Sequence, residues 1–470
     1  MRSLRKIIKS SAMPFMVIFI SFLSFNFNFF GAANNSWFHI HDLHSEQLVL
    51  DGILNGLDKD DSNDSGFRLG GYSRPGVSDE TSDPYNLLIH DLYQEKNRLG
   101  DFSLYRSQYG LQTRVFGSMA KLGYGDIRIL KGLSALLMSF VVGILFWLVC
   151  RDFSPASAVV FSLALIFSPW VIVFAKNLYW VPVTWFLPLA VSMYFSNKVF
   201  TSNRSLIALL LSLFFVFLIK FLCGYEYVTT IFIASFVPIL YQGVKSKISV
   251  MRISKIFFLT FLIFIISLAT AMGIHVKSNF KDIPSGVSFL VEKSASRTYS
   301  ADPEVFENPR IRESLNSNGL MVVARYMITF YDFAPWLPSI RDISVLENDE
   351  DIKILKEVYS KPSLRTLQDS VFKTSNYLKF ALFSVVISSL SFLVLLGFMF
   401  RLWFKVDSPL KAVILISFTA PVSWFFLAKA HSYIHYQLNY VLWYLPFIPY
   451  SFAILFENFV NRKNRRLKAL

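Results

Sequence analysis

Long apolar runs recur along this chain, separated by short polar segments that carry most of its charge. A helix that crosses a bilayer needs roughly 20 apolar residues, and ten runs approach that length. They lie near residues 12–32, 129–150, 156–175, 179–196, 206–223, 228–244, 255–275, 376–400, 410–428 and 438–460. The pattern predicts an all-α polytopic membrane protein with about ten transmembrane helices.

Two long polar segments interrupt this series. Residues 33–128 contain a loop rich in Asp, Gly and Ser between stretches with helical spacing, and residues 276–375 contain six prolines. Both segments predict modules of short helices and loops. The predicted organisation is an N-terminus (1–11), a first membrane helix (12–32), a large first loop (33–128), six membrane helices (129–275), a second module (276–375), three membrane helices (376–460) and a basic tail (461–470).

The distribution of charge predicts how these helices are oriented. The chain is 54% hydrophobic and 17% charged, with a mean hydropathy of +0.45 and a net charge of +14. If the N-terminus is cytoplasmic, 19 basic residues fall in short inside segments and only Lys176 and Lys429 in short outside loops. This asymmetry follows the positive-inside rule. The basic clusters are therefore topology signals, both long segments are expected outside, and nucleic acid is not an expected partner.

The first apolar run has an alternative interpretation as a signal peptide. A basic start, an apolar stretch and the small residues Gly31, Ala32 and Ala33 resemble a cleavable leader. The run is longer and more aromatic than a usual signal core and ends without a clean Ala-x-Ala site, which favours a retained helix. Cys150 and Cys223, the only cysteines, are expected at opposite membrane faces, so they should not pair.

Candidate acid–base groups follow the first apolar run directly, in residues 36–57. Asp42 and Glu46 are four residues apart, and this spacing in a helix would present two carboxylates on one face. A partly desolvated carboxylate at the membrane surface can deprotonate an acceptor hydroxyl. The alternative is a solvated polar face at the start of an outside helix, with Ser45 or Asp42 as its cap.

The order of these features resembles the GT-C superfamily of glycosyltransferases, which use polyprenyl-phosphate sugars. The resemblance rests on a long first membrane helix, a large first outside loop that opens with an acidic motif, and many helices after it. Residues 105–110 (YRSQYG) and 168–180, at the turn between the third and fourth membrane helices, look similar to the same superfamily. The resemblance covers the N-terminal half of the chain well and the rest loosely.

The resemblance implies that a carboxylate just beyond the first helix is the catalytic base. In the superfamily this motif is often Asp-Glu, whereas this chain has Ser45-Glu46 with Asp42 earlier. Both Glu46 and Asp42 therefore stay open as the base. Glu46 is preferred because it matches the second position of the pair, while Asp42 could cap the helix.

Further outside residues are candidates for binding the substrates. Glu226 lies in a turn so short that its carboxylate must sit at the bilayer boundary, where a charge is costly unless the interface solvates it. Arg106 and Lys176 offer cations for a lipid phosphate, although Lys176 could instead snorkel to headgroups. The same segments supply three more expected substrate-binding residues, Gln108, Tyr179 and Trp180.

His431 and His435 lie in the last outside loop with a spacing of four residues. Two histidines so spaced can share a helix face, but the Glu of a zinc-hydrolase H-E-x-x-H motif is missing. The histidines near Asp42 contain no such pair either. We therefore predict no metal site and no cofactor, a divalent metal being without support. His431 and His435 are expected to line the substrate site or to belong to an interfacial aromatic belt.

These residues and the resemblance together predict an integral-membrane glycosyltransferase of the kind that modifies bacterial surface glycans such as O-antigen. It would transfer a sugar, with inversion, from a polyprenyl-phosphate donor to a glycan or lipid acceptor on the periplasmic side of the bacterial inner membrane. The expected partners are these two substrates and membrane lipids. Neither a P-loop nor a G-x-G-x-x-G motif opens a helix. Two alternatives stay open: a flippase or transporter of a lipid-linked saccharide, and an O-antigen-type polymerase.

Overall fold

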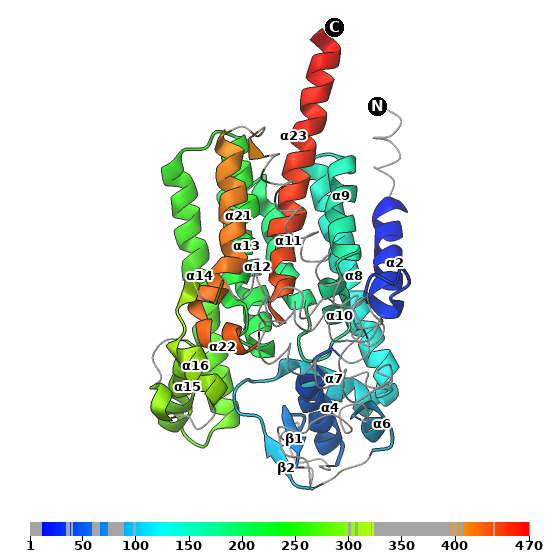
Figure 1. Cartoon of the computed structure of the whole chain (residues 1–470), viewed down its shortest axis with the longest axis vertical. Coiled ribbons are helices and arrows are strands. Elements are labelled where there is room, and N and C mark those ends of the chain that lie inside the picture. Colours follow the sequence, from blue (N-terminus) through cyan, green and yellow to red (C-terminus); the bar gives the residue numbers. More distant parts are fainter. Residues whose placement is uncertain are drawn as a thin grey trace, which may run out of the picture.

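The computed structural model describes residues 12–33, 38, 41–58, 66–73, 89–96, 100–298, 302–305, 309–320, 322–323, 397, 400, 403–404, 406, 408–435 and 438–469. Long helices form a bundle, and shorter elements gather at one of its ends (Figure 1). Within the described residues, six helices are long and apolar enough to cross a membrane. They are α8 (Ile127–Asp152), α12 (Asn203–Cys223), α13 (Val228–Lys245), α14 (Val250–Asn279), α21 (Ser408–Leu427), and η6 (Tyr440–Tyr444) continued by α23 (Phe447–Ala469).

Other predicted spans are shorter or broken. The apolar helices α2 (Ala12–Phe27) and α11 (Val183–Ser196) are short, and α9 (Pro155–Ile166) and α10 (Pro169–Ala175) form a pair bent by 68° that would make a seventh span. The predicted run 376–400 lies almost entirely outside the described residues. The chain is thus a mostly helical, multi-pass membrane protein, and the number of ten spans stays a prediction.

The break between α9 and α10 has a local cause. Pro169 has no backbone N–H and cannot continue the helix that ends at Ile166, and the Ser168 hydroxyl starts the new helix by accepting a hydrogen bond from the Val171 N–H at 3.2 Å. The bend brings the chain into the turn of residues 176–182, which leads to α11. This turn carries three of the predicted substrate-binding residues.

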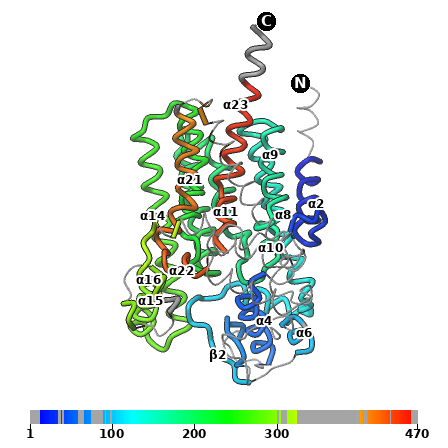
Figure 2. The backbone as a smooth tube through the Cα atoms, in the orientation of Figure 1, coloured from blue at the N-terminus to red at the C-terminus, as the bar shows by residue number. Residues whose placement is uncertain are grey.

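The start of the first described helix and the end of the last lie at one end of the bundle. In Figure 2, α2 begins and α23 ends toward the same end of the bundle, while α4, α6 and β2 lie at the opposite end. Cys150 and Cys223 are both free, as expected. Which end faces the cytoplasm stays a prediction.

The first predicted outside module contains helices and a small sheet. Its elements are α4 (Leu43–Asp58), β1 (Gly70–Tyr72), α6 (Ile89–Gln94), β2 (Phe102–Leu104), α7 (Leu111–Met119) and a π-helical turn (Ala120–Tyr124). The two strands pair antiparallel, with Gly70 opposite Leu104, and this small sheet is compatible with the expected all-α fold, since the described chain is mostly helical. Gly56 of α4 and Gly117 of α7 both face the Phe67 ring, where a Cβ would meet ring carbon at 2.2 and 2.3 Å. Only glycine allows these two helices to close on that ring.

The second predicted outside module is described in part. It contains α15 (Ile283–Arg297), a 3₁₀ turn (Pro303–Val305) and α16 (Pro309–Asn316), and it contacts α22 (Lys429–Ile434). The buried Lys429 ammonium donates to the backbone carbonyls of Leu315 and Ser317 at the end of α16. A cation at a helix C-terminus stabilises its carbonyls, so Lys429 fastens α16 to α22.

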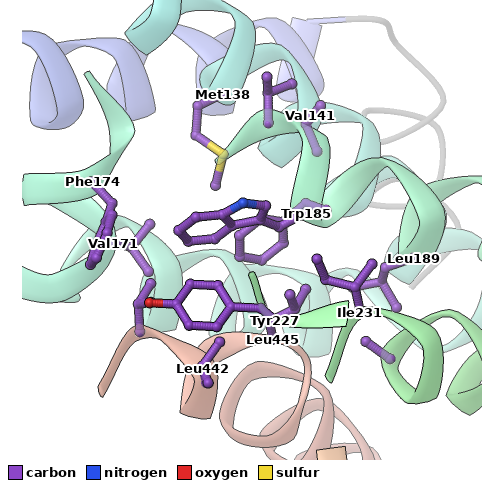
Figure 3. Packing of buried hydrophobic residues seen from close by; sticks show 14 of the residues in the cluster. Met138, Val141, Val171, Phe174, Trp185, Leu189, Tyr227, Ile231, Leu442 and Leu445 are labelled. Atoms are coloured by element: carbon purple, nitrogen blue, oxygen red, sulfur yellow. The ribbon is translucent and has the colours of Figure 1, made fainter. Parts of the chain in front are cut away.

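Aromatic side chains fill the core near the end of the bundle that carries these modules. Figure 3 shows Trp185 and Tyr227 beside each other among Met138, Val171 and Phe174. The Trp185 and Tyr227 rings meet edge to face with centroids 5.1 Å apart. This cluster packs against the turn of residues 176–182.

Candidate functional site

Asp42 and Glu46 point in different directions. Helix α4 begins at Leu43, so Asp42 precedes its first turn, and its backbone adopts a left-handed conformation with φ of 52°. The Asp42 carbonyl accepts a hydrogen bond from the Glu46 N–H at 3.2 Å. The expectation that the two carboxylates share one helix face is therefore wrong, because Asp42 is not helical.

The side chain of Glu46, a residue of α4, is completely buried. Its carboxylate accepts hydrogen bonds from the Lys131 ammonium at 2.7 Å and from the Leu178 N–H at 3.0 Å, and it lies 2.9 Å from His90 Nε2. Burial alone would raise the pKa of Glu46, but the Lys131 charge and His90 outweigh it and lower the pKa to about 2. A buried carboxylate with three partners is a weak base, which favours a structural role for Glu46.

Asp42 faces a cavity instead. The Trp180 indole N–H donates to its Oδ2 at 2.5 Å. The cavity has a volume of about 340 Å³ and lies among the first predicted outside module, α15 and α22. Its lining contains six of the residues singled out in the sequence: Asp42, Tyr179, Trp180, Glu226, His431 and His435.

Gln108 holds two of these lining residues in place by hydrogen bonds. Its amide nitrogen donates to the Tyr179 hydroxyl at 2.7 Å and to the Glu226 carboxylate, and its side chain is buried. Gly224 permits this close packing, since a Cβ there would lie 2.4 Å from a Glu226 carboxylate oxygen. Glu226 is thus held by hydrogen bonding at the edge of the bundle, as a costly interfacial charge requires.

Two cations that the sequence analysis missed also line the cavity. Lys293 and Arg297 lie one helical turn apart in α15, and an Arg297 N–H donates to the Tyr105 hydroxyl at 3.3 Å. The spacing of four residues was visible in the sequence. The sequence could not show that α15 packs beside α22, so that both cations line the same cavity as His431.

A second cavity of about 280 Å³ shares Glu226, Lys293, Arg297 and His431 with the first. Its remaining wall includes apolar side chains from three membrane helices: Val228 of α13, Leu268 and Met272 of α14, and Trp424 and Leu427 of α21. The two cavities, a polar chamber and an apolar limb, are therefore adjacent, and the two cations line both of them.

Arg106 and Lys176 line neither cavity. The Arg106 side chain is exposed, while its carbonyl lies 3.2 Å from His275 Nε2. Lys176 is buried with its ammonium 3.4 Å from the centre of the Phe38 ring. Burial and the nearby Lys131 charge lower the pKa of Lys176 to about 7. The structure therefore does not bring these two predicted phosphate ligands to the site.

His431 and His435 lie next to each other with ring centroids 4.8 Å apart. Burial, followed by the proximity of His435 and Arg297, lowers the pKa of His431 well below its ordinary value. A neutral imidazole can donate one hydrogen bond and accept another, which suits the hydroxyl groups of a sugar. Among the described residues no group of three or more His, Cys, Asp or Glu side chains is placed to hold a metal ion.

The site thus combines two carboxylates, two cations, two histidines and aromatic rings beside an apolar limb. Comparisons with known proteins add no relative to this picture. No protein-family model, no curated protein and no solved structure matches the chain.

Proposed function

We propose that this chain is an integral-membrane glycosyltransferase. It transfers a sugar from a polyprenyl-phosphate donor to a hydroxyl of a glycan or lipid acceptor on the outer side of a bacterial inner membrane. The observation that carries the proposal is the shape of the site. One polar chamber contains the carboxylate Asp42, and it adjoins, at Lys293 and Arg297, an apolar limb between membrane helices. Such a site suits a substrate that has a sugar, a phosphate and a lipid tail.

Asp42 is the proposed base. The acceptor hydroxyl oxygen attacks the anomeric carbon from the face opposite the phosphate, so the new glycosidic bond forms as the bond from carbon to phosphate oxygen breaks. The hydroxyl proton passes to Asp42, and the configuration inverts. Asp42 is favoured over Glu46 because it lines the chamber, whereas Glu46 has no exposed surface.

Arg297 and Lys293 are the proposed ligands of the departing polyprenyl phosphate. Negative charge grows on the phosphate as its bond to the sugar breaks, and cations at that point stabilise the transition state. Arginine also presents a planar fork of donors that matches two phosphate oxygens. The prenyl chain would then lie along Val228, Leu268, Met272 and Leu427 of the apolar limb.

The test is transfer from a purified polyprenyl-phosphate sugar to an acceptor, with protein in detergent or nanodiscs. Asp42→Asn removes the base but keeps its shape, so we expect turnover to fall by about 10²- to 10⁴-fold. Glu46→Gln is measured in parallel and normalised to the amount of folded protein, because a lower turnover per folded molecule in Glu46→Gln than in Asp42→Asn would assign the base to Glu46. If the variants with one amide and with both amides transfer sugar at the wild-type rate, the carboxylate mechanism is wrong.

Transport of a lipid-linked saccharide is the second candidate function. The feature that favours it is the broken pair α9–α10, because discontinuous helices commonly form transporter binding sites. An ionisable residue, Lys220, also lies in the last turn of the apolar helix α12, where it donates to the Gly224 carbonyl at 2.6 Å. Wild-type protein that moves labelled lipid across proteoliposomes but transfers no sugar would establish transport and contradict the proposed enzyme.

A further inference from the structure

We propose that Trp180 is a positioning residue for Asp42: its indole N–H fixes one carboxylate oxygen and favours the ionised form that accepts a proton. This inference rests on the proposed function for its kinetic part and on geometry for the contact itself. The Trp180 Nε1 to Asp42 Oδ2 distance is 2.5 Å, and Trp180 is buried. A hydrogen bond to a charged acceptor is short and strong.

Trp180 is itself held from two sides. Its ring stacks on the Tyr227 ring, with an interplanar angle of 14° and centroids 5.5 Å apart, and its edge meets Phe174. Tyr227 in turn donates its hydroxyl to the Leu438 carbonyl at 2.8 Å. The indole therefore cannot turn away from Asp42 without disturbing the aromatic core.

Asn177 fastens the two chain segments that make this contact. Its Oδ1 accepts the N–H groups of Tyr179 and Trp180 at 2.9 and 3.2 Å, and its Nδ2 donates to the His41 carbonyl at 3.0 Å. One amide side chain thus joins the turn before α11 to the residue before Asp42. This bridge explains how a non-helical aspartate with a left-handed backbone keeps a defined orientation.

Asp42 also interacts electrostatically with the other ionisable groups around the chamber. Its own segment carries His41, His44 and the buried Glu46, and the rest come from the elements packed around the chamber: Tyr105, Tyr179, Glu226, Tyr227, Lys293, Arg297, His431 and His435. These groups are the same in a Trp180 variant. A difference between wild type and Trp180→Phe therefore isolates the indole N–H.

The kinetic experiment compares two Trp-to-Phe variants of the full-length protein. Trp180→Phe keeps an aromatic ring but loses the donor, so we expect kcat to fall about 10- to 100-fold with little change in acceptor KM. The acidic limb of the pH–rate profile should move to higher pH, because the ionised carboxylate has lost a partner. Trp185→Phe is the matched control, since Trp185 lies in the same cluster and its indole N–H, within the described structure, has no acceptor. Identical profiles for the two variants would overturn the proposal.

A second measurement does not depend on activity. The indole ¹H–¹⁵N signal of Trp180, assigned by its absence from Trp180→Phe, should move with pH in the wild type as the Asp42 carboxylate is protonated. In Asp42→Asn that movement should disappear. An indole signal with the same pH dependence in both proteins contradicts the Trp180 contact, whatever the transfer rate. Full activity of Asp42→Asn instead contradicts the proposed base, whatever the indole signal does.

Discussion

The Lys131 ammonium of α8 lies 2.7 Å from the carboxylate of Glu46 in α4, and no solvent reaches that carboxylate. This ion pair joins a membrane helix to the first predicted outside module. His90 of α6 and the Leu178 N–H reach the same carboxylate. Glu46 therefore connects four segments, of which α4 and the turn of residues 176–182 line the chamber, and we expect its loss to lower stability first.

Replacing Glu46 by Gln should destabilise the fold. The variant leaves the nearly buried Lys131 cation facing a neutral amide, and breaking a buried ion pair typically costs about 3–5 kcal/mol. We expect a lower unfolding midpoint in heat or SDS titrations. Arg128→Gln is the control, because the Arg128–Asp126 pair is exposed and should leave the midpoint unchanged. Equal midpoints for Glu46→Gln and wild type would show that the buried pair stabilises nothing.

The same ion pair predicts how stability depends on pH. The pKa of Glu46 is about 2 in the folded protein and 4.5 ordinarily, so the folded state binds this proton less readily than the unfolded state. The contribution is complete above pH 4.5 and is lost as the pH falls toward 2. It amounts to about 3 kcal/mol. Unfolding midpoints measured across this window should fall more steeply in wild type than in Glu46→Gln, and parallel curves would contradict the assignment.

Arg297→Ala should weaken donor binding. Loss of a charge-assisted contact with phosphate is worth roughly 1.5–3 kcal/mol, or about a 10- to 150-fold rise in donor KM. Arg297→Lys should restore donor binding only in part if the contact with the phosphate is bidentate. Arg106→Ala provides the comparison, since the exposed Arg106 side chain lines neither cavity. A larger rise in donor KM for Arg106→Ala than for Arg297→Ala would instead assign phosphate binding to Arg106, as the sequence predicted.

His431 should remain neutral at physiological pH. Its pKa is lowered by burial and by His435 and Arg297, so its imidazole should not titrate between about pH 6 and 8, where an ordinary histidine does. Histidine-selective NMR gives the measurement, with His431→Gln assigning the signal. A His431 resonance that titrates near pH 6.5 would show that the ring is solvated.

Introduced cysteines should distinguish the two ends of the bundle. Ser103 of β2 and Ser246, directly after α13, are both exposed and lie at opposite ends of the bundle. With the predicted orientation, a membrane-impermeant thiol reagent should label Ser103→Cys in intact cells and Ser246→Cys only after permeabilisation. The native cysteines are half-buried or buried, so they give a low background. The reverse labelling pattern would show that the predicted topology is inverted.

Much of the candidate site could be foreseen because topology restricts where polar groups can meet. Tyr179, Glu226 and His431 were singled out in outside loops, and helices of similar length that alternate in direction bring such loops to one end of the bundle. The orientation of individual side chains could not be foreseen. Arg106 and Gln108 are two residues apart, yet one is exposed and the other buried.

Other features escaped prediction for different physical reasons. The strands β1 and β2 have three residues each, too short for an alternating pattern to be recognised. Arg297 lies in a segment where no motif stands out, and only its packing beside α22 gives it a role. Asp42 has a left-handed backbone that non-glycine residues rarely adopt, so helical spacing wrongly placed it within α4.

The chamber takes its walls from residues as far apart as Asp42 and His431. A ribosome adds about 5–20 residues per second, so Asp42 emerges roughly 20 to 80 seconds before His431. The N-terminal residues of the chamber are therefore synthesised before the residues of α22 that complete its lining. A nascent or truncated chain that lacks α22 therefore contains Asp42 but lacks the wall that His431 and Ile434 supply, and the chamber is complete only after the final helices are inserted.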